Sequence, residues 1–105
     1  MNVQPFVLGA ANTLTLAVTA ASAGMTVPGA FIGANVVQVY NSGTATAYLR
    51  ATVGASTAVV PTASVLGDTP IPSGVVIVFT KGLADTLTAI GAGATSLSFT
   101  FGEGQ

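Results

Sequence analysis

The sequence predicts an all-β fold, an antiparallel β-sandwich or jelly-roll-like domain of about seven to eight short strands. Larger apolar residues alternate with small polar ones over much of the chain, which is the pattern of strands with one buried face. Val and Thr are frequent in these stretches, and β-branched residues fit a pleated sheet better than a helix. No stretch carries the apolar spacing of an amphipathic helix.

The alternation is clearest in residues 13–19 and 95–101. In each stretch Thr and Ser occupy one face of the expected strand, and larger apolar residues occupy the other. Across the whole chain, the residues that we expect in the core are Leu14, Leu16, Val18, Val37, Val39, Leu49, Ile77, Phe79, Ile90, Leu97 and Phe99.

Two hairpins are predicted from turn residues between strands. The first joins Val36–Asn41 to Thr44–Thr52, with Gly43 supplying a turn position of positive φ. The second joins Thr86–Ile90 to Thr95–Phe101 through a glycine-rich turn.

Other stretches complete the expected domain. Val75–Thr80 is a continuous apolar run, typical of a strand covered on both faces. The Ala-rich stretches Ala20–Gly24 and Gly54–Ala58 are predicted as loops. We expect residues 1–105 to form one domain, with residues 1–12 as an extended N-terminal arm.

The segment Asp68–Gly74 has two interpretations. Pro70 and Pro72 fix φ and remove two backbone donors, so this segment cannot be a central strand. It is either a sheet edge protected from unwanted pairing or a preformed loop that docks on a partner at little entropic cost.

The low charge content indicates a surface that packs against other proteins. Only 5% of the 105 residues are charged, against about 25% in an average soluble domain. The chain has no cysteine, so no disulfide compensates for its small core, and association with a partner is the expected compensation. With two basic residues and a net charge of −1, the chain lacks the cationic cluster that binds nucleic acid.

Composition also argues against an enzyme, a metal site, a cofactor or a small-molecule substrate. Histidine and cysteine are absent, so serine has no ordinary base and zinc no ordinary ligands. The carboxylates Asp68, Asp85 and Glu103 are expected to be solvated or paired with Arg50 or Lys81. Every apolar run is interrupted well before the ~20 residues that a membrane-spanning helix needs, so no membrane is expected.

Three groups of residues are candidates for contacts with a partner. The N-terminal apolar triplet would be costly to expose, a strand-borne Arg beside a Tyr can bind a carboxylate or carbonyl, and the proline segment is preorganised. The candidate interface residues are Phe6, Val7, Leu8, Tyr48, Arg50, Pro70, Ile71 and Pro72.

Several segments in their order along the chain resemble small virion proteins of tailed bacteriophages, a group that includes capsid decoration or cement proteins. They are Val36–Arg50, Asp68–Gly74, Phe79, Leu87–Ile90 and Leu97–Gly104, and they fall in roughly the last two-thirds of the chain. The resemblance implies a β-sandwich or jelly roll that binds major capsid protein on the outside of a capsid. It implies no catalytic residue. The low charge content favours association with further copies of the chain, and since no basic n-region of a signal peptide precedes the first apolar stretch, we expect synthesis in a host cytoplasm.

Two other functions remain open from the sequence. A tail or head-fibre component would have the same composition and differ only in its location on the virion. A secreted adhesin or carbohydrate-binding module would normally display Trp and Tyr to sugar rings, and this chain has no Trp and two Tyr.

Overall fold

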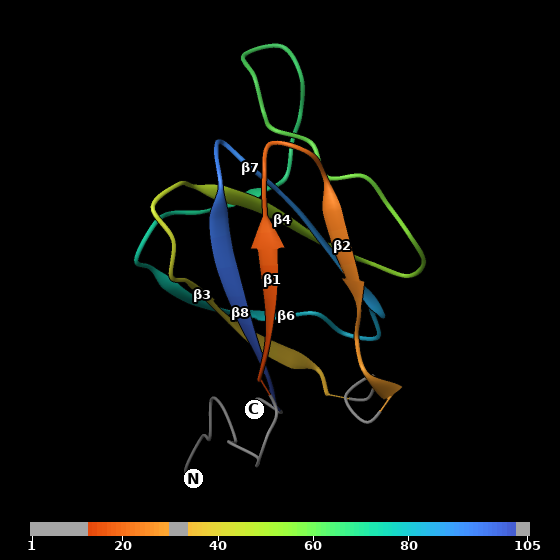
Figure 1. The fold of residues 1–105 in the computed structure, drawn as a ribbon. Coiled ribbons are helices and arrows are strands. Elements are labelled where there is room, and N and C mark those ends of the chain that lie inside the picture. The colour runs from red at the N-terminus through yellow and green to blue at the C-terminus, as the bar shows by residue number, and fades with distance from the viewer. Residues whose placement is uncertain (1–12, 30–33, 103–105) are drawn as a thin grey trace, which may run out of the picture.

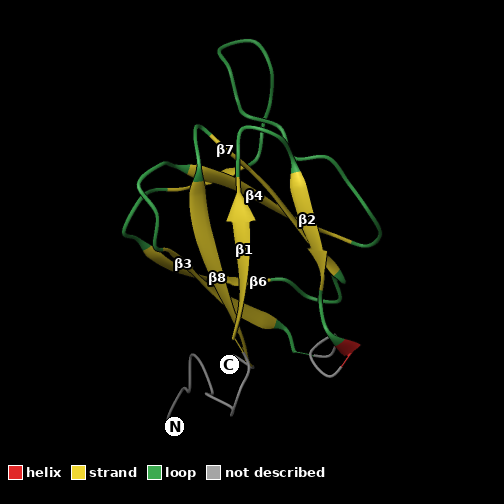
Figure 2. Ribbon diagram, in the orientation of Figure 1, coloured by secondary structure: helices red, strands yellow, loops and turns green. Residues whose placement is uncertain are grey.

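A computed structural model describes residues 13–29 and 34–102, and it confirms the all-β prediction (Figures 1 and 2). Within these residues, eight strands form two four-stranded sheets, and every strand pair is antiparallel. The strands are β1 (Thr13–Val18), β2 (Ala23–Thr26), β3 (Val36–Asn41), β4 (Ala47–Thr52), β5 (Thr69–Ile71), β6 (Val76–Thr80), β7 (Thr86–Gly91) and β8 (Thr95–Gly102).

The order of the strands is that of a jelly roll. One sheet, here called sheet A, has the order β1-β8-β3-β6, and the other, sheet B, has the order β2-β7-β4-β5. The first strand therefore pairs with the last, the second with the seventh, the third with the sixth and the fourth with the fifth. This is the result of folding a long antiparallel ribbon over itself, as in double-sheet jelly rolls.

Both predicted hairpins are wrong, because their strands belong to different sheets. Strand β3 lies in sheet A and β4 in sheet B, while β7 lies in sheet B and β8 in sheet A. Each turn therefore crosses between the layers of the sandwich. Gly43 does not have the expected positive φ. Instead, a Cβ on Gly43 would lie 2.7 Å from the Cα of Thr95, so the glycine permits a close approach of two backbones.

Asn41 fixes the crossover from β3 to β4. Its side chain is fully buried, and its amide nitrogen donates to the carbonyl oxygens of Ala45 and Ile71, both at 2.8 Å. Its amide oxygen accepts from the backbone N–H of Gly43 at 3.1 Å and from the hydroxyl of Thr95 at 2.6 Å. All the hydrogen-bonding capacity of this amide is therefore used inside the chain.

The core lies between the sheets and follows the predicted alternation closely. Most predicted core residues are buried, and Leu16, Ile77 and Phe79 pack against the core with part of their surface exposed. The prediction for Ile90 is wrong: it stands opposite Tyr48 on the outer face of sheet B, where it is half-buried. Leu14 is 39% exposed, contrary to the prediction. It lies on an edge strand, and β2, at the corresponding edge of sheet B, has only four residues and leaves the start of β1 uncovered.

Two further predictions about strands need correction. Residues Ala20–Gly24, predicted as a loop, include the start of β2. Strand β6, within the run predicted to be covered on both faces, is an edge strand, and its Val76 and Val78 side chains are exposed. The expected arm of residues 1–12 lies outside the described residues.

Candidate interaction surface

Of the two candidate residues on β4, Arg50 contacts the chain's own connection to β5. Tyr48 and Arg50 are both half-buried on the outer face of sheet B. The Nε of Arg50 donates to Oδ1 of Asp68 at 2.9 Å, and its Nη1 donates to the hydroxyl of Ser56 at 2.8 Å. The guanidinium therefore holds the connection between β4 and β5 on sheet B, and Asp68 is paired with Arg50, one of the two outcomes expected for that carboxylate.

The proline segment forms a sheet edge. Strand β5 pairs with β4 at one edge of sheet B, in agreement with the first interpretation of this segment. Pro70 and Pro72 remain exposed, whereas Ile71 is only 1% exposed and its side chain belongs to the core. The candidates Phe6, Val7 and Leu8 lie outside the described residues.

The loop of residues 59–68 projects from one end of the sandwich, where it is drawn in green at the top of Figure 1. Its base is closed twice: the N–H of Asp68 donates to the carbonyl of Val59 at 2.9 Å, and the N–H of Val59 donates to Oδ2 of Asp68 at 2.7 Å. Within the loop, the N–H of Thr62 donates to the carbonyl of Val65 at 3.0 Å. These bonds limit the conformations open to the loop.

The side chain of Leu66, in this loop, is almost fully exposed to solvent. It is 97% exposed, and the neighbouring Val65 is also exposed. The prediction from sequence did not include this pair. The signal that could have found it is an apolar dipeptide between Pro61 and Gly67 that belongs to no alternating stretch.

A second exposed apolar pair lies on two turns at the ends of β4 and β6. Val53 and Leu83 are both strongly exposed. Their turns are held together because the N–H of Asp85 donates to the carbonyl of Thr52 at 3.1 Å, and Oδ1 of Asp85 accepts from the N–H of Gly54 at 2.8 Å. The hydrogen bond from Gly54, followed by that from the Thr86 hydroxyl, lowers the pKa of Asp85 below its usual value.

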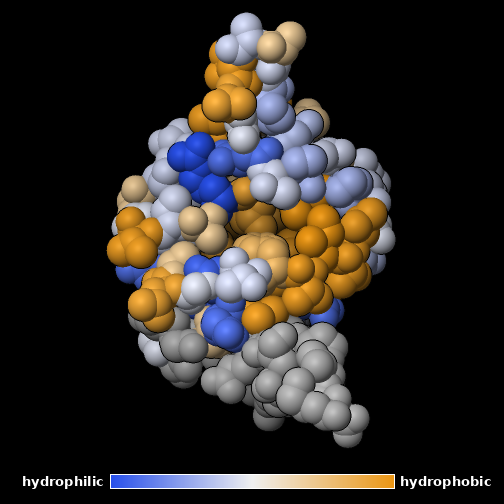
Figure 3. Space-filling view, turned by 180° about the vertical axis from the view of Figure 1, so that it is seen from behind, coloured by the Kyte–Doolittle hydropathy of each residue, from blue (hydrophilic) through white to orange (hydrophobic). Residues whose placement is uncertain are grey.

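An apolar groove opens between the edge strands β5 and β6. It has a volume of about 150 Å³ and is lined by Leu49, Thr69, Ile71, Ile77 and Phe79. Figure 3 shows the side of the molecule that is turned away in Figure 1, with hydrophobic side chains gathered in a broad patch beside a hollow.

The charged side chains of the described residues are all engaged within the chain. Arg50 pairs with Asp68, Asp85 accepts two hydrogen bonds, and the Nζ of Lys81 donates to the carbonyls of Gly82 and Ala84 at 3.2 and 3.3 Å. Burial lowers the pKa of Lys81. The strands of sheet A contain no charged residue at all. The outer face of sheet A therefore receives no charge from its own strands.

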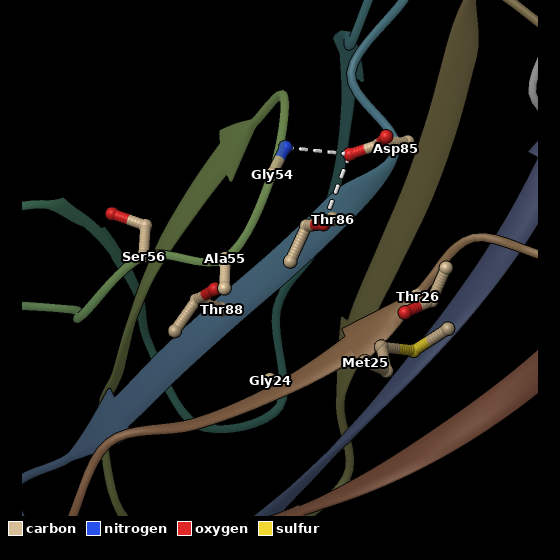
Figure 4. A pocket seen from close by; sticks show the side chains of 9 residues that line it. All are labelled: Gly24, Met25, Thr26, Gly54, Ala55, Ser56, Asp85, Thr86 and Thr88. Atoms are coloured by element: carbon tan, nitrogen blue, oxygen red, sulfur yellow. Dashed lines mark hydrogen bonds between the residues drawn. The ribbon is translucent and has the colours of Figure 1, made fainter.

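A second, more polar groove lies on the outer face of sheet B and is shown in Figure 4. It has a volume of about 460 Å³. Thr86 and Thr88 of β7 form its floor, residues 24–26 of β2 lie on one side, and residues 54–56 lie on the other (Figure 4). Thr88 is only 2% exposed, and its hydroxyl has no hydrogen-bond partner. The free-energy cost of removing the Thr88 hydroxyl from water is therefore not offset by a hydrogen bond.

Replacing Thr88 by valine is expected to raise the free energy of unfolding by about 1 kcal/mol, because valine keeps the shape and removes the unpaired hydroxyl. Urea denaturation of both proteins measures this change. Thr86→Val is the matched control, since the Thr86 hydroxyl donates to Oδ1 of Asp85 at 3.0 Å and its loss should destabilise. A destabilised Thr88→Val protein would mean that the hydroxyl has a partner in solution.

The described residues offer no metal centre and no membrane span. Within 13–29 and 34–102, no three side chains of the metal-binding types His, Cys, Asp and Glu come together. None of these residues belongs to a helix long and apolar enough to cross a membrane.

Comparisons of the chain with protein-family models, curated proteins and solved structures gave no match. The fold and its surface define the class: an all-β, jelly-roll-like sandwich that presents apolar side chains on hydrogen-bonded loops and a sheet edge.

Proposed function

We propose that this protein is a structural virion protein, a capsid decoration or cement protein that stabilises a shell by packing on major capsid protein. The observation that carries the proposal is Leu66, an almost fully exposed apolar side chain on a loop closed by hydrogen bonds. The resemblance of several short segments between Val36 and Gly104 to small phage virion proteins supplies the class of partner.

The physical argument is one of preorganised apolar contact. Complete burial of a leucine side chain contributes about 1.5–3 kcal/mol, and a loop that already has its bound shape loses little entropy on docking. Val53 and Leu83 add a second apolar contact. Since the charges of the described residues are engaged within the chain, attachment should depend on packing more than on ion pairs.

Copy number tests the proposed location. Quantitative mass spectrometry of purified virions would compare this protein with the major capsid protein. Hundreds of copies per particle would support decoration of the shell, whereas about a dozen would identify a tail or head-fibre component, in keeping with the lower symmetry of those structures. Absence from purified particles would contradict any virion role.

Replacing Leu66 by serine is expected to weaken binding to empty shells by about tenfold or more, because burial of the leucine side chain is lost. Cosedimentation of the protein with shells measures the affinity. The folded state should be unaffected, since the side chain touches little of its own chain. Ser64→Ala, a change at another exposed position of the same loop, is the matched control. If the Leu66→Ser and parent proteins bind shells with equal affinity, Leu66 is not part of the interface.

A further inference from the structure

The four sheet edges of this sandwich differ in how well they are protected. Strand β5 carries Pro70 and has three residues, and β2 has four residues with a glycine among them. Strands β1 and β6 both lack proline, glycine and charge, but the exposed outer face of β1 carries Thr13 and Thr15, whereas that of β6 carries Val76 and Val78. An apolar edge without such features pairs readily with another strand, and proteins that remain monomeric normally avoid it.

The hydrogen-bond ladder between β3 and β6 shows which backbone N–H and C=O groups of β6 bond to β3 and which point to the open side of the sheet. At one end the N–H of Asn41 donates to the carbonyl of Val75 at 3.1 Å, and at the other the N–H of Lys81 donates to the carbonyl of Asn35 at 2.9 Å. Hydrogen-bonded pairs alternate along an antiparallel ladder, so between these ends Ile77 and Phe79 bond to β3.

The backbone N–H and C=O groups of Val76, Val78 and Thr80 consequently point away from β3. No strand in the described part of the chain pairs with that side of β6. The side chains of these three residues lie on the outer face of sheet A, where Val76 is 52% and Val78 is 47% exposed. Open backbone groups and exposed apolar side chains thus occur on the same residues.

We propose that two copies of this protein associate by antiparallel pairing of their β6 strands, which joins the two A sheets into one continuous sheet. Val78 lies opposite Val78 of the second copy, and Val76 lies opposite its Thr80, since this register pairs all five residues of the strand. The inference concerns the isolated protein and does not depend on the virion role.

A second copy is the occupant that this edge fits best. A two-fold axis brings identical surfaces together, so any charge near the axis would meet its like. The strands of sheet A contain no charged residue, and Lys81, next in the chain, is buried. The alternating open groups of β6 also have the spacing needed to bond to a copy of themselves in antiparallel orientation.

Hydrogen exchange of the unmodified protein tests the pairing residue by residue. The amides of Ile77 and Phe79, which bond to β3, should be protected at every concentration. The amides of Val76, Val78 and Thr80 should exchange quickly in dilute solution and become protected as sedimentation detects dimers, toward about 100 µM for an interface of this small size. Protection of these three amides in the monomer would overturn the proposal, because it would mean that the chain covers its own edge.

A charge at the two-fold axis provides the second test. Val78→Lys places two ammonium groups opposite each other and should abolish the dimer, whereas the uncharged, β-branched control Val78→Thr should keep it. Thr15→Lys makes the same kind of change on β1, the other edge of sheet A, and should leave dimerisation unchanged. If Thr15→Lys abolishes the dimer, the symmetric β6 pairing is wrong, and the two copies instead associate through β1 of one and β6 of the other. A monomer at all concentrations, with no protection of the three amides, would also contradict the proposal.

Discussion

Replacing Phe99 by alanine is expected to lower the free energy of unfolding by about 3–5 kcal/mol, since the variant loses apolar burial and leaves a cavity. Phe99 is fully buried on β8, where it stands opposite Leu14 of β1 and Val39 of β3. Its side chain therefore lies between two paired strands within sheet A and faces the core.

Urea denaturation monitored by circular dichroism measures this loss. Thr100→Ala is the matched control, because Thr100 follows Phe99 on the same strand and its side chain points to the outer face, where it shares a hydrogen bond with Thr13. The control should cost well under half as much. If Phe99→Ala and the parent protein are equally stable, the side chain of Phe99 does not contribute to a packed core.

Replacing Asn41 by leucine should be comparably damaging, at about 3 kcal/mol or more. Leucine has a similar size but makes none of the four hydrogen bonds, and it leaves the Gly43 N–H, the Thr95 hydroxyl and the Ala45 and Ile71 carbonyls without this partner. Each buried group left unpaired costs about 1–3 kcal/mol.

The same denaturation experiment measures the Asn41 effect, with Ser42→Ala as the control. Ser42 is the next residue and is exposed, and its hydroxyl makes one long bond of 3.4 Å to the carbonyl of Ser96. The control should change stability by about 0.5 kcal/mol or less. If Asn41→Leu behaves like the control, the crossover does not depend on the amide.

The strands were predictable because their signal is local. Leu97 and Phe99 alternate with Ser96 and Ser98, and this alternation alone defines a buried and an exposed face. The pairing of strands was not predictable in this way. Asn41-Ser42-Gly43 has the composition of a hairpin turn, but turn residues have the same composition when the chain crosses between sheets. Which strand lies beside β3 is decided by partners far away in the sequence.

The candidate surface was less predictable than the fold. Composition allowed Asp68 to be solvated or to pair with Arg50 or Lys81, and the choice was not predictable, because Asp68 lies 18 residues beyond Arg50 and reaches it only when the intervening segment folds onto sheet B. Val75–Thr80 was expected to be covered on both faces. An apolar run indicates only that burial is favourable, and it does not say whether the same chain or another molecule provides the cover.

The pairing of β1 with β8 also determines when this protein can fold. Thr13 stands opposite Thr100, and β8 separates β1 from β3, so sheet A remains in two pieces until the last strand has left the ribosome. Contacts between such distant parts of a chain form slowly. During that time the apolar strands β3 and β6 lack the partner that completes their sheet, which is the period in which a nascent chain of this kind is most exposed to aggregation.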